Sequence, residues 1–196
     1  NYTLDTSTTL YAQWAQSLPE ILSQSADTSI KAGNDIAYFV NASGAELTYQ
    51  WQRNGSNITG ATDSVYYIDT VTRNDSANYL CIVSNSAGSD TSDTILLNVI
   101  SVVAVSSWLN HTMILMTDGT LWATGRNNLG QLGDGTTTDR YSPVNVMSNV
   151  SSVSAGGYHS MIIKTDGTLW ATGYNSYGQF GDGTTLDKSN PVWIRF

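Results

Sequence analysis

The feature that most constrains this chain is an internal repeat in its second half. The segment Thr117–Gly125 returns unchanged as Thr165–Gly173, and more than half of positions 102–148 are identical to their partners in 150–196. Identity of this extent, without a gap, does not arise by chance. We expect each repeat to form one supersecondary unit, and we expect neighbouring units to stack so that their apolar faces are buried.

Each repeat is predicted to consist of strands and turns. In the first repeat the β-prone runs are Val102–Val105, Met113–Met116, Thr120–Thr124 and Val144–Met147. Between the second and third runs, Asp118-Gly119 predicts a type I′ turn, in which both central residues have positive φ. Four short strands in a repeat of this length fit one blade of a β-propeller. The sequence therefore predicts two blades, at 102–148 and 150–196.

Glycines punctuate each repeat after the third strand. Gly125 and Gly133 recur as Gly173 and Gly181. Glycine is favoured where the chain crosses another segment so closely that a Cβ atom would clash. We therefore expect a tight crossing in each blade.

The string His…Thr-Asp-Gly-Thr-Leu-Trp-Ala…Gly-x-Asn-x-x-Gly-Gln-Leu/Phe-Gly-Asp-Gly-Thr-Thr…Pro-Val, present twice, resembles the regulator of chromosome condensation repeat. It is most similar to the bacterial version found in secreted and surface proteins. Thr124 and Thr172 depart from the pattern where an aromatic residue often precedes the glycine, and Phe180 replaces the usual leucine. That family closes a propeller with about seven blades, so the resemblance implies further repeats downstream in the parent protein.

Residues 16–99 show alternating apolar strands separated by turn signals, as in a β-sandwich. The apolar positions that share a face are Ile36, Tyr38 and Val40, then Leu47, Tyr49 and Trp51, then Tyr79, Cys81 and Val83, and finally Ile95, Leu97 and Val99. Trp51 resembles the strand-C tryptophan of immunoglobulin domains. The segment Asp75-Ser-Ala-Asn-Tyr-Leu-Cys81 resembles the motif that enters strand F of those domains, with Tyr79 placed as in a tyrosine corner. The resemblance implies an immunoglobulin-like domain.

The predicted immunoglobulin-like domain lacks the usual disulfide. Cys81 is the single cysteine of the chain, and Val40 stands near the place of its expected partner. Bacterial immunoglobulin-like domains commonly lack this pair. We therefore expect Cys81 to be an inert core thiol and the domain to depend on packing around Trp51.

Residues 1–15 end in Thr9-Leu10-Tyr11-Ala12-Gln13-Trp14, which resembles the closing strand of the Listeria–Bacteroides repeat, a small β module of bacterial surface proteins. The resemblance implies that this segment is the end of such a module. The predicted organisation is thus all-β, with this tail, an immunoglobulin-like domain at 16–99, and two blades of an incomplete propeller at 100–196.

Charge excludes some classes of partner. The chain has a net charge of −8, only 12% of its residues are charged, and no run of Lys or Arg occurs. Phosphate contacts need clustered cations, so nucleic acid and anionic membrane surfaces are not expected partners. No apolar run reaches the ~20 residues of a membrane span, and we expect no membrane insertion within this chain.

His111 and His159 are the obvious catalytic candidates, but they occupy the same position in both repeats. A repeated residue usually serves the repeat, so we expect each imidazole to bond a neighbouring backbone group. No serine or carboxylate pattern completes a triad with them. We expect no catalytic residues and no cofactor.

The repeated carboxylates are candidate ligands for calcium. These residues are Asp118, Asp134 and Asp139, with their partners Asp166, Asp182 and Asp187. Their spacing does not match a calcium loop, and turn geometry explains Asp before Gly. Asp139 and Asp187 each precede a base, Arg140 or Lys188, so we expect a local ion pair. We expect no metal site.

Trp122 and Trp170 are expected to pack between the blades. Exposed aromatic residues on a propeller face could instead stack on sugar rings, and that alternative stays open.

Three functions remain in view. The favoured hypothesis is a modular bacterial extracellular or cell-surface protein, in which these domains act as a non-catalytic module that binds a protein or a carbohydrate. The second is a propeller regulator that promotes nucleotide exchange on a small GTPase, as some proteins with this repeat do. The third is an enzyme whose catalytic domain lies outside this chain. No ligand-binding residue can be named from the sequence.

Overall fold

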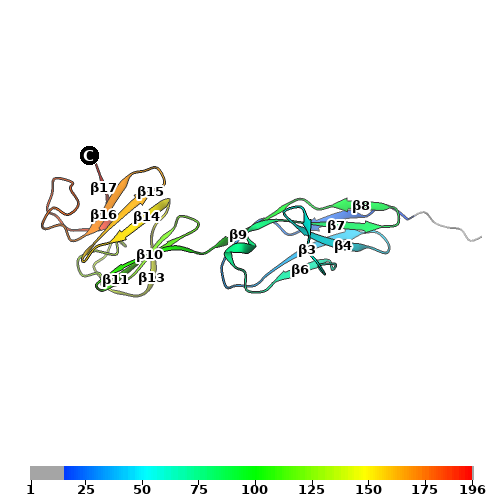
Figure 1. The fold of residues 1–196 in the computed structure, drawn as a ribbon, viewed down its shortest axis with the longest axis horizontal. Coiled ribbons are helices and arrows are strands. Elements are labelled where there is room, and N and C mark those ends of the chain that lie inside the picture. The colour runs from blue at the N-terminus through cyan, green and yellow to red at the C-terminus, as the bar shows by residue number, and fades with distance from the viewer. Residues whose placement is uncertain (1–15, 196) are drawn as a thin grey trace, which may run out of the picture. The chain divides into compact units, whose positions relative to one another are not determined.

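A computed structural model describes residues 16–195 and confirms the all-β class. The chain divides into two compact units, with the boundary between Asn98 and Val99. Figure 1 shows strands and connecting loops in both units. Among residues 16–195, no helix is long and apolar enough to cross a membrane. The predicted Listeria–Bacteroides tail at 1–15 lies outside the described residues.

The first unit contains two sheets. The smaller sheet has the order β1-β3-β6, formed by Glu20–Gln24, Ile36–Ser43 and Val65–Ile68. The larger sheet has the order β2-β9-β7-β4-β5, formed by Thr28–Lys31, Ile95–Ile100, Ala77–Asn85, Thr48–Arg53 and Ser56–Asn57. A further strand, β8 (Gly88–Thr91), pairs with β7, and the 3₁₀ turn Arg73–Asp75 precedes β7. This arrangement is that of a β-sandwich.

Alternation along the strands builds the core of the first unit. On β7 the residues Tyr79, Cys81 and Val83 are buried, and the residues between them are more exposed. Trp51 on β4 pairs with Cys81 across the sheet and is fully buried. Its indole Nε1 donates to the carbonyl oxygen of Asp63 at 2.9 Å, which satisfies the one polar atom of this side chain.

The tyrosine expected at a corner makes the expected type of contact. The Tyr79 hydroxyl donates to the backbone carbonyl of Asp75 at 2.9 Å, and burial raises the pKa of Tyr79 to about 12. Asp75 accepts hydrogen bonds from the backbone and hydroxyl of Thr72, both at 2.8 Å. These bonds fix the chain just before it enters β7.

The thiol of Cys81 lies in the apolar interior. Cys81 and Val40 are both almost fully buried, on β7 and β3 respectively. Burial raises the pKa of the Cys81 thiol to about 11, so the reactive thiolate is scarce at neutral pH. Around this position, Tyr66 packs at a ring-centroid distance of 6.0 Å from both Trp51 and Tyr79. Trp51, the cross-strand neighbour of Cys81, is thus part of an aromatic cluster in this core.

The second unit contains two four-stranded antiparallel sheets, one per repeat. The first sheet, here the first blade, has the order β10-β11-β12-β13, formed by Val102–Trp108, His111–Met116, Leu121–Gly125 and Arg140–Met147. The second blade has the order β14-β15-β16-β17, formed by Val150–Ala155, His159–Lys164, Leu169–Gly173 and Lys188–Ile194. Each repeat therefore forms a complete four-stranded meander (Figure 1).

The predicted type I′ turn at Asp118-Gly119 is wrong in detail. Gly119 has φ of 77°, but Asp118 is not among the residues with positive φ. The Gly119 amide donates to the Met116 carbonyl, which closes a turn over residues 116–119. The Met116 amide donates to the Thr120 carbonyl, so Gly119 forms a bulge at the end of this turn. The Asp118 carboxylate accepts from the Thr120 amide at 2.9 Å, which explains aspartate here without a positive φ.

The two blades share one hydrophobic core. It joins five buried residues of the first blade to three of the second: Met113, Leu115, Leu121, Ala123 and Leu132 with Val150, Ala155 and Ile162. The partly buried Trp170 packs against this cluster. Stacking of repeat on repeat therefore supplies the burial that a single blade lacks.

We expect Trp51→Ala to unfold the first unit at a lower temperature, with a loss of about 3–5 kcal/mol, because the change leaves a large cavity and an unpaired Asp63 carbonyl. Thermal unfolding followed by near-ultraviolet circular dichroism of the whole chain measures this loss. Tyr67→Ala is the control, because Tyr67 is 67% exposed in the same sandwich. Equal melting temperatures for the two variants would contradict the core assignment.

Candidate functional site

The repeat separates structural residues from candidate binding residues. A side chain that is identical in both blades and makes the same contact in each serves the blade. A side chain that differs from its partner in the other repeat is free of that constraint. Repeated polar residues therefore indicate the framework, and residues that break the repeat indicate positions available to a ligand.

His111 contacts the neighbouring blade through a hydroxyl group. Its Nε2 lies 3.0 Å from Oγ of Ser160, and that hydroxyl donates to the backbone carbonyl of Gln131 at 2.9 Å. A hydroxyl has one proton, so Ser160 must accept from His111, and Nε2 carries the imidazole proton. The prediction that His111 bonds a backbone group is therefore wrong in detail. The imidazole bonds the Ser160 hydroxyl, and that hydroxyl bonds the backbone.

His159 lies at the corresponding place in the second blade and is less buried than His111. Its ring makes no hydrogen bond to another residue in the described range 16–195. Burial lowers the pKa of both imidazoles below the ordinary value of 6.5, and the charge of His159 lowers the pKa of His111 further. Neither ring lies beside a nucleophile and a carboxylate arranged as in a triad.

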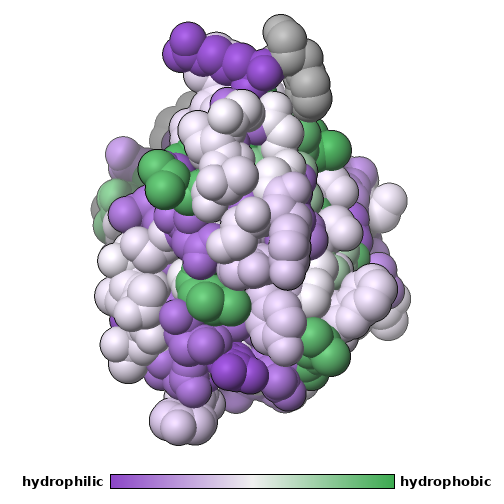
Figure 2. Space-filling view, turned by 90° about the vertical axis from the view of Figure 1, so that its left-hand side faces the viewer, coloured by the Kyte–Doolittle hydropathy of each residue, from purple (hydrophilic) through white to green (hydrophobic). Residues whose placement is uncertain are grey.

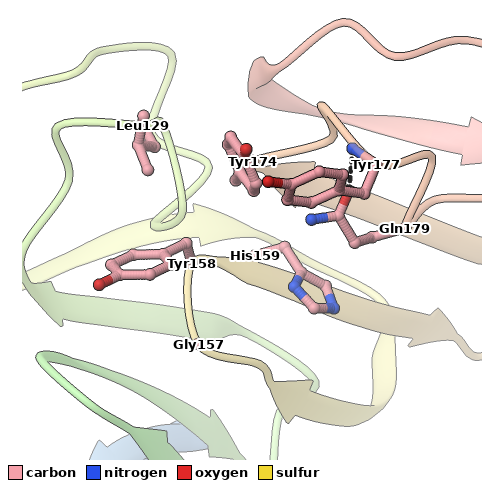
Figure 3. Close-up of a pocket in the computed structure, with 7 residues that line it drawn as sticks. All are labelled: Leu129, Gly157, Tyr158, His159, Tyr174, Tyr177 and Gln179. Carbon is pink, nitrogen blue, oxygen red and sulfur yellow. Dashed lines mark hydrogen bonds between the residues drawn. The ribbon is translucent and has the colours of Figure 1, made fainter.

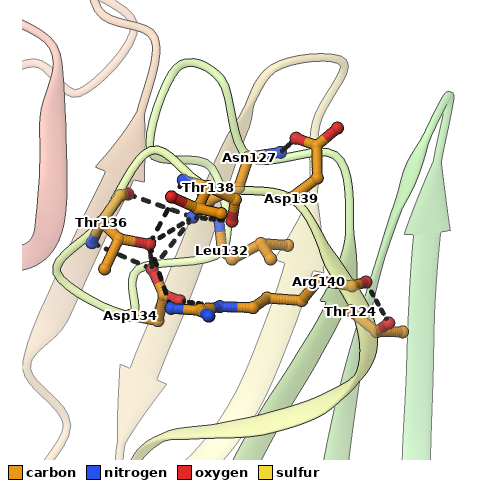
Figure 4. A network of polar contacts seen from close by, with 8 residues as sticks. All are labelled: Thr124, Asn127, Leu132, Asp134, Thr136, Thr138, Asp139 and Arg140. Atoms are coloured by element: carbon orange, nitrogen blue, oxygen red, sulfur yellow. Dashed lines mark hydrogen bonds and ion pairs between the residues drawn. The ribbon is translucent and has the colours of Figure 1, made fainter.

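A buried asparagine organises the loop after the third strand of each blade (Figure 4). The Asn127 side chain is fully buried, and its Oδ1 accepts from the amide of Leu132 at 3.0 Å. Its Nδ2 donates to Asp134 at 2.9 Å and to the carbonyls of Thr136 and Thr138 at 3.0 and 3.1 Å. In the second blade, Oδ1 of Asn175 accepts in the same way from the Phe180 amide at 3.0 Å. This asparagine ties the loop to itself.

The ion pair expected beside Asp139 forms with a different carboxylate. Arg140 Nε lies 2.6 Å from Oδ2 of Asp134, whereas Asp139 accepts from the backbone amide of Asn127 at 2.7 Å (Figure 4). Burial alone would raise the pKa of Asp134, but hydrogen bonds from Thr136, Arg140 and Asn127 lower it overall. In the second blade, Asp187 likewise accepts from the amide of Asn175 at 2.7 Å.

The repeated aspartates therefore serve loops and turns. Asp118 accepts from the amide and the hydroxyl of Thr120, and Asp166 accepts from the same groups of Thr168. Asp182 accepts in the same way from Thr184. Within residues 16–195, no group of three or more His, Cys, Asp or Glu side chains is placed to hold a metal ion.

The repeated tryptophans and glycines make the same contacts within each blade, and Trp170 also packs against the core that the blades share. Trp122 and Trp170 donate from Nε1 to the hydroxyls of Thr120 and Thr168, and Trp170 also lies under the Lys164 ammonium, 5.2 Å from the ring centroid. A Cβ atom on Gly125 or Gly173 would lie within 2.4 Å of a backbone oxygen, so these positions exclude a side chain.

The glycine position occupied by Gly133 and Gly181 differs between the blades. A Cβ atom on Gly133 would lie 3.0 Å from the Thr172 side chain, whereas one on Gly181 would meet nothing within 4 Å. Both residues have positive φ, 77° and 71°, so backbone conformation favours glycine at each. Only at Gly133 does a neighbouring blade add a steric reason.

Several residues that break the repeat line one cavity of the second unit, with a volume of about 470 Å³ (Figure 3). Its lining residues are Leu129, Gly157, Tyr158, His159, Tyr174, Tyr177 and Gln179. We call this cavity the tyrosine pocket. Tyr174 and Tyr177 meet edge to face with centroids 5.8 Å apart, and Figure 3 shows Tyr158 across the pocket from them, on the side of Leu129.

None of the three tyrosines belongs to the repeat. The first blade has Asn110, Arg126 and Leu129 where the second has Tyr158, Tyr174 and Tyr177. Tyr177 is 86% exposed, so folding gains little from its ring, and Tyr158 is 39% exposed. The pocket can offer aromatic faces, phenolic hydroxyls and the imidazole of His159 to a ligand.

Arg126 adds one cation to the surroundings of the pocket. Its guanidinium carbon lies 5.9 Å from the centroid of the Tyr158 ring, and its Nε donates to Asn128 at 2.8 Å. On the side of the molecule shown in Figure 2, strongly hydrophobic residues occur singly among pale and polar ones. A ligand on such a surface would meet mixed aromatic and polar groups.

Neither the tyrosine pocket nor the buried side chains of Asn127 and Asn175 were predicted from the sequence. Asn127 and Asn175 were part of the repeated motif, and their identity in both repeats was the available signal. The tyrosines carried the opposite signal, since they occur where the repeats differ. Their convergence depends on turns that bring positions 158, 174 and 177 together, which the spacing alone does not show.

Comparison with known families identifies the two kinds of domain. Two family models described as "Regulator of chromosome condensation (RCC1) repeat" match residues 118–163 and residues 99–131 with 150–179. A model described as "Immunoglobulin domain" matches residues 19–85. The chain therefore contains RCC1 repeats, which suggest propeller blades, and an immunoglobulin-like domain. No curated protein sequence matches the chain.

Solved structures similar to this chain include several immunoglobulin domains. One, titled "Tandem Ig repeats of Dlar", is 21% identical, covers 42% of this chain and 48% of its own, and has a TM-score of 0.40. Titin domain M7 is 27% identical and covers 43% of this chain and 96% of its own, with a TM-score of 0.39. The chain thus spans about half the length of the Dlar structure that it matches.

We expect the second unit to lose stability as the pH falls below 6.5, because burial holds the pKa of His111 and His159 below that value in the folded state. The unfolded chain then binds protons first, so acid favours unfolding. Carboxylates contribute only at more acidic pH, since their ordinary pKa is 3.8. Thermal unfolding at pH about 7.5 and about 5.5 measures the effect.

The control is the double variant His111→Gln, His159→Gln, which removes both titrating rings. Its melting temperature should change less between the two pH values than that of the parent chain, even if its stability is lower at both. An unchanged pH dependence in the double variant would mean that other groups control the acid response.

Proposed function

We propose that this chain is part of a modular bacterial extracellular or cell-surface protein, and that it acts as a non-catalytic binding module. The observation that carries the proposal is the tyrosine pocket, where three side chains that the repeat does not require line one cavity. The ligand is a protein or a carbohydrate that contacts these aromatic faces.

The domain content supports a binding module. RCC1 repeats and an immunoglobulin-like domain occur together in this chain, and both kinds of domain present loops from a rigid β framework. In the second unit the framework is the repeated network around Asn127 and Asn175. Loops held in this way can carry variable residues without loss of the fold.

The chemistry of the pocket supports recognition. Tyrosine combines a flat apolar ring with a hydroxyl that can donate and accept, and it loses little conformational entropy on binding. A sugar ring can stack on such a face while its hydroxyls meet polar groups, and a protein side chain can do the same. The Gln179 side chain has a structural role in the loop, since its Oε1 accepts from the Tyr177 amide at 3.0 Å.

Composition supports the proposed location. Surface polarity comes mainly from uncharged residues, since only 12% of the chain is charged. The immunoglobulin-like domain reaches a buried core around Trp51 with a lone cysteine and no disulfide. The sequence resemblance to bacterial surface-protein repeats points to the same setting.

We expect the double variant Tyr174→Ala, Tyr177→Ala to weaken ligand binding at least about tenfold, because stacking on each ring contributes on the order of 1 kcal/mol or more. The labelled chain would be screened on a glycan array and against a displayed peptide library. Binding of the best ligand would then be measured by titration calorimetry.

Tyr141→Ala is the matched control, because Tyr141 is 97% exposed, lies on β13 and does not line the pocket. This variant should bind as the parent chain does. If the double variant bound its ligand as tightly as the control, the pocket would not be the contact site. A glycan or a peptide as the best ligand would decide which class of partner the module takes.

A further inference from the structure

One positive charge stands beside the tyrosine pocket, and no negative charge lines it. The chain has 16 acidic residues against 8 basic ones, yet none of the residues that line the pocket is Asp or Glu. The acidic residues of the second unit all accept hydrogen bonds in their own turns and loops: Asp118, Asp134, Asp139, Asp166, Asp182 and Asp187. A ligand in the pocket therefore meets no lining carboxylate.

Arg126 supplies the positive charge. Its guanidinium carbon lies 5.9 Å from the ring centroid of the lining residue Tyr158, and its Nε donates to Oδ1 of Asn128 at 2.8 Å. Within residues 16–195, the terminal nitrogens of this guanidinium make no hydrogen bond and no ion pair. Their N–H groups are therefore available to an acceptor, and they form a planar fork that matches a carboxylate.

The fold of the blade does not require this cation. The second blade has Tyr174 at the position of Arg126, and its loop keeps the hydrogen bonds made by Asn175. The other arginine of the first blade, Arg140, is bound to Asp134 and belongs to the framework. Arg126 is thus the arginine of this blade whose charge is left for contact with a ligand.

Residues of both blades form this end of the pocket. Arg126 and Leu129 belong to the loop after β12, and Tyr158 and Tyr174 belong to the second blade. Backbone hydrogen bonds hold the two arms, since the Arg126 amide donates to the Asn110 carbonyl and the Tyr174 amide donates to the Tyr158 carbonyl, both at 2.8 Å. The contact between the two blades therefore places the guanidinium beside the aromatic rings.

The pocket also offers uncharged polar groups. The hydroxyls of Tyr158, Tyr174 and Tyr177 make no hydrogen bond to another residue in the described part of the chain, so each can donate to a ligand or accept from it (Figure 3). Burial lowers the pKa of His159 below 6.5, so its imidazole is neutral at neutral pH. Arg126 consequently sets the sign of the charge that a bound ligand meets.

These groups set three requirements for a ligand: a flat apolar face for the tyrosine rings, hydroxyls for the phenols, and an anionic group for the guanidinium. A sugar ring that carries a carboxylate meets all three, because its C–H groups form an apolar face and its hydroxyls and carboxylate lie around the rim. The side chain of Asp or Glu supplies the carboxylate without a ring. A polyanion is disfavoured by the net charge of −8.

We propose that the tyrosine pocket binds an acidic glycan, with a carboxylated sugar ring stacked on its tyrosines and the carboxylate bound by Arg126. This assignment rests on the proposed function, in which the same pocket is the contact site. It adds the class of ligand and the residue that selects it. Arg126 distinguishes acidic from neutral sugars, whereas the tyrosines contact both.

Paired glycans test the proposal with the whole chain. A glycan array would carry each glycan that ends in a uronic or sialic acid beside the same glycan with its carboxyl group reduced to an alcohol. Titration calorimetry would then compare the best acidic glycan with its reduced form. The parent chain should bind the acidic form about fivefold more tightly, as expected for an ion pair near the surface. This preference should shrink when salt is raised from about 0.1 M to about 1 M.

Arg126→Gln should bind the two forms with similar affinity, close to that of the parent chain for the reduced form. Arg195→Gln is the matched control, because the Arg195 guanidinium also lies over an aromatic ring, 4.4 Å from the centroid of Trp193, and Arg195 does not line the pocket. Both variants lose the same charge from the same unit. The control should keep the preference of the parent chain.

Equal affinity of the parent chain for the two forms would overturn the proposal, and so would a preference that survives Arg126→Gln. A neutral glycan or a peptide as the best ligand, or no binding to any acidic glycan, would overturn it as well. Loss of neutral binding in the variant Tyr174→Ala, Tyr177→Ala would then leave the proposed function in place without the acidic sugar. Acidic binding that this double variant does not weaken would instead exclude the pocket, and the proposed function with it.

Discussion

The second unit depends on one interaction, the contact of the loop after β12 with the neighbouring blade. The Ser160 hydroxyl accepts from His111 and donates to the Gln131 carbonyl. The Thr172 hydroxyl donates to the carbonyl of the preceding residue, Gly130. The Ser160 hydroxyl gives the buried Gln131 carbonyl a partner, and the Gly130 carbonyl accepts from both Thr172 and the Gly133 amide. The bonds between the blades also set the distance between them, and therefore the packing of the core that they share. Asn127 gives the loop the shape in which its carbonyls can point at the second blade.

The same frame explains why the second blade can carry a pocket. Asn175 holds the loop of the second blade as Asn127 holds that of the first, and Gln179 fixes the backbone at Tyr177. The backbone at position 177 is therefore held in place independently of its side chain, and the equivalent residue of the first blade is Leu129. Tyr158 and Tyr174 are joined through the backbone, since the Tyr174 amide donates to the Tyr158 carbonyl at 2.8 Å. Rigid backbone with free side chains is the arrangement that recognition requires.

Much of the fold was predictable because alternation and repetition are local properties of the sequence. Apolar periodicity located the strands around Trp51 and Tyr79, and the internal repeat located both four-stranded sheets. The turn at Asp118 was predicted wrongly because Asp-Gly suits two turn types, and hydrogen bonding of the carboxylate to Thr120 selects between them. The partner of Arg140 depends on how the loop folds back, so its pairing with Asp134 rather than Asp139 could not be read from adjacency.

The pocket was hidden for a more general reason. A sequence repeat is recognised from the residues that are identical in both copies. In this unit those identical residues include His111 and Asn127, which stabilise the blades. Residues that do not hold the blade together are found by comparing the two repeats and noting the positions where they differ while the framework stays the same. Tyr177 is such a residue, because its ring is 86% exposed and the loop beneath it is held by other groups. What distinguishes Tyr177 from a singly exposed aromatic such as Tyr141 is its place in a cavity with two other tyrosines, and that grouping makes it a candidate for contact with a ligand.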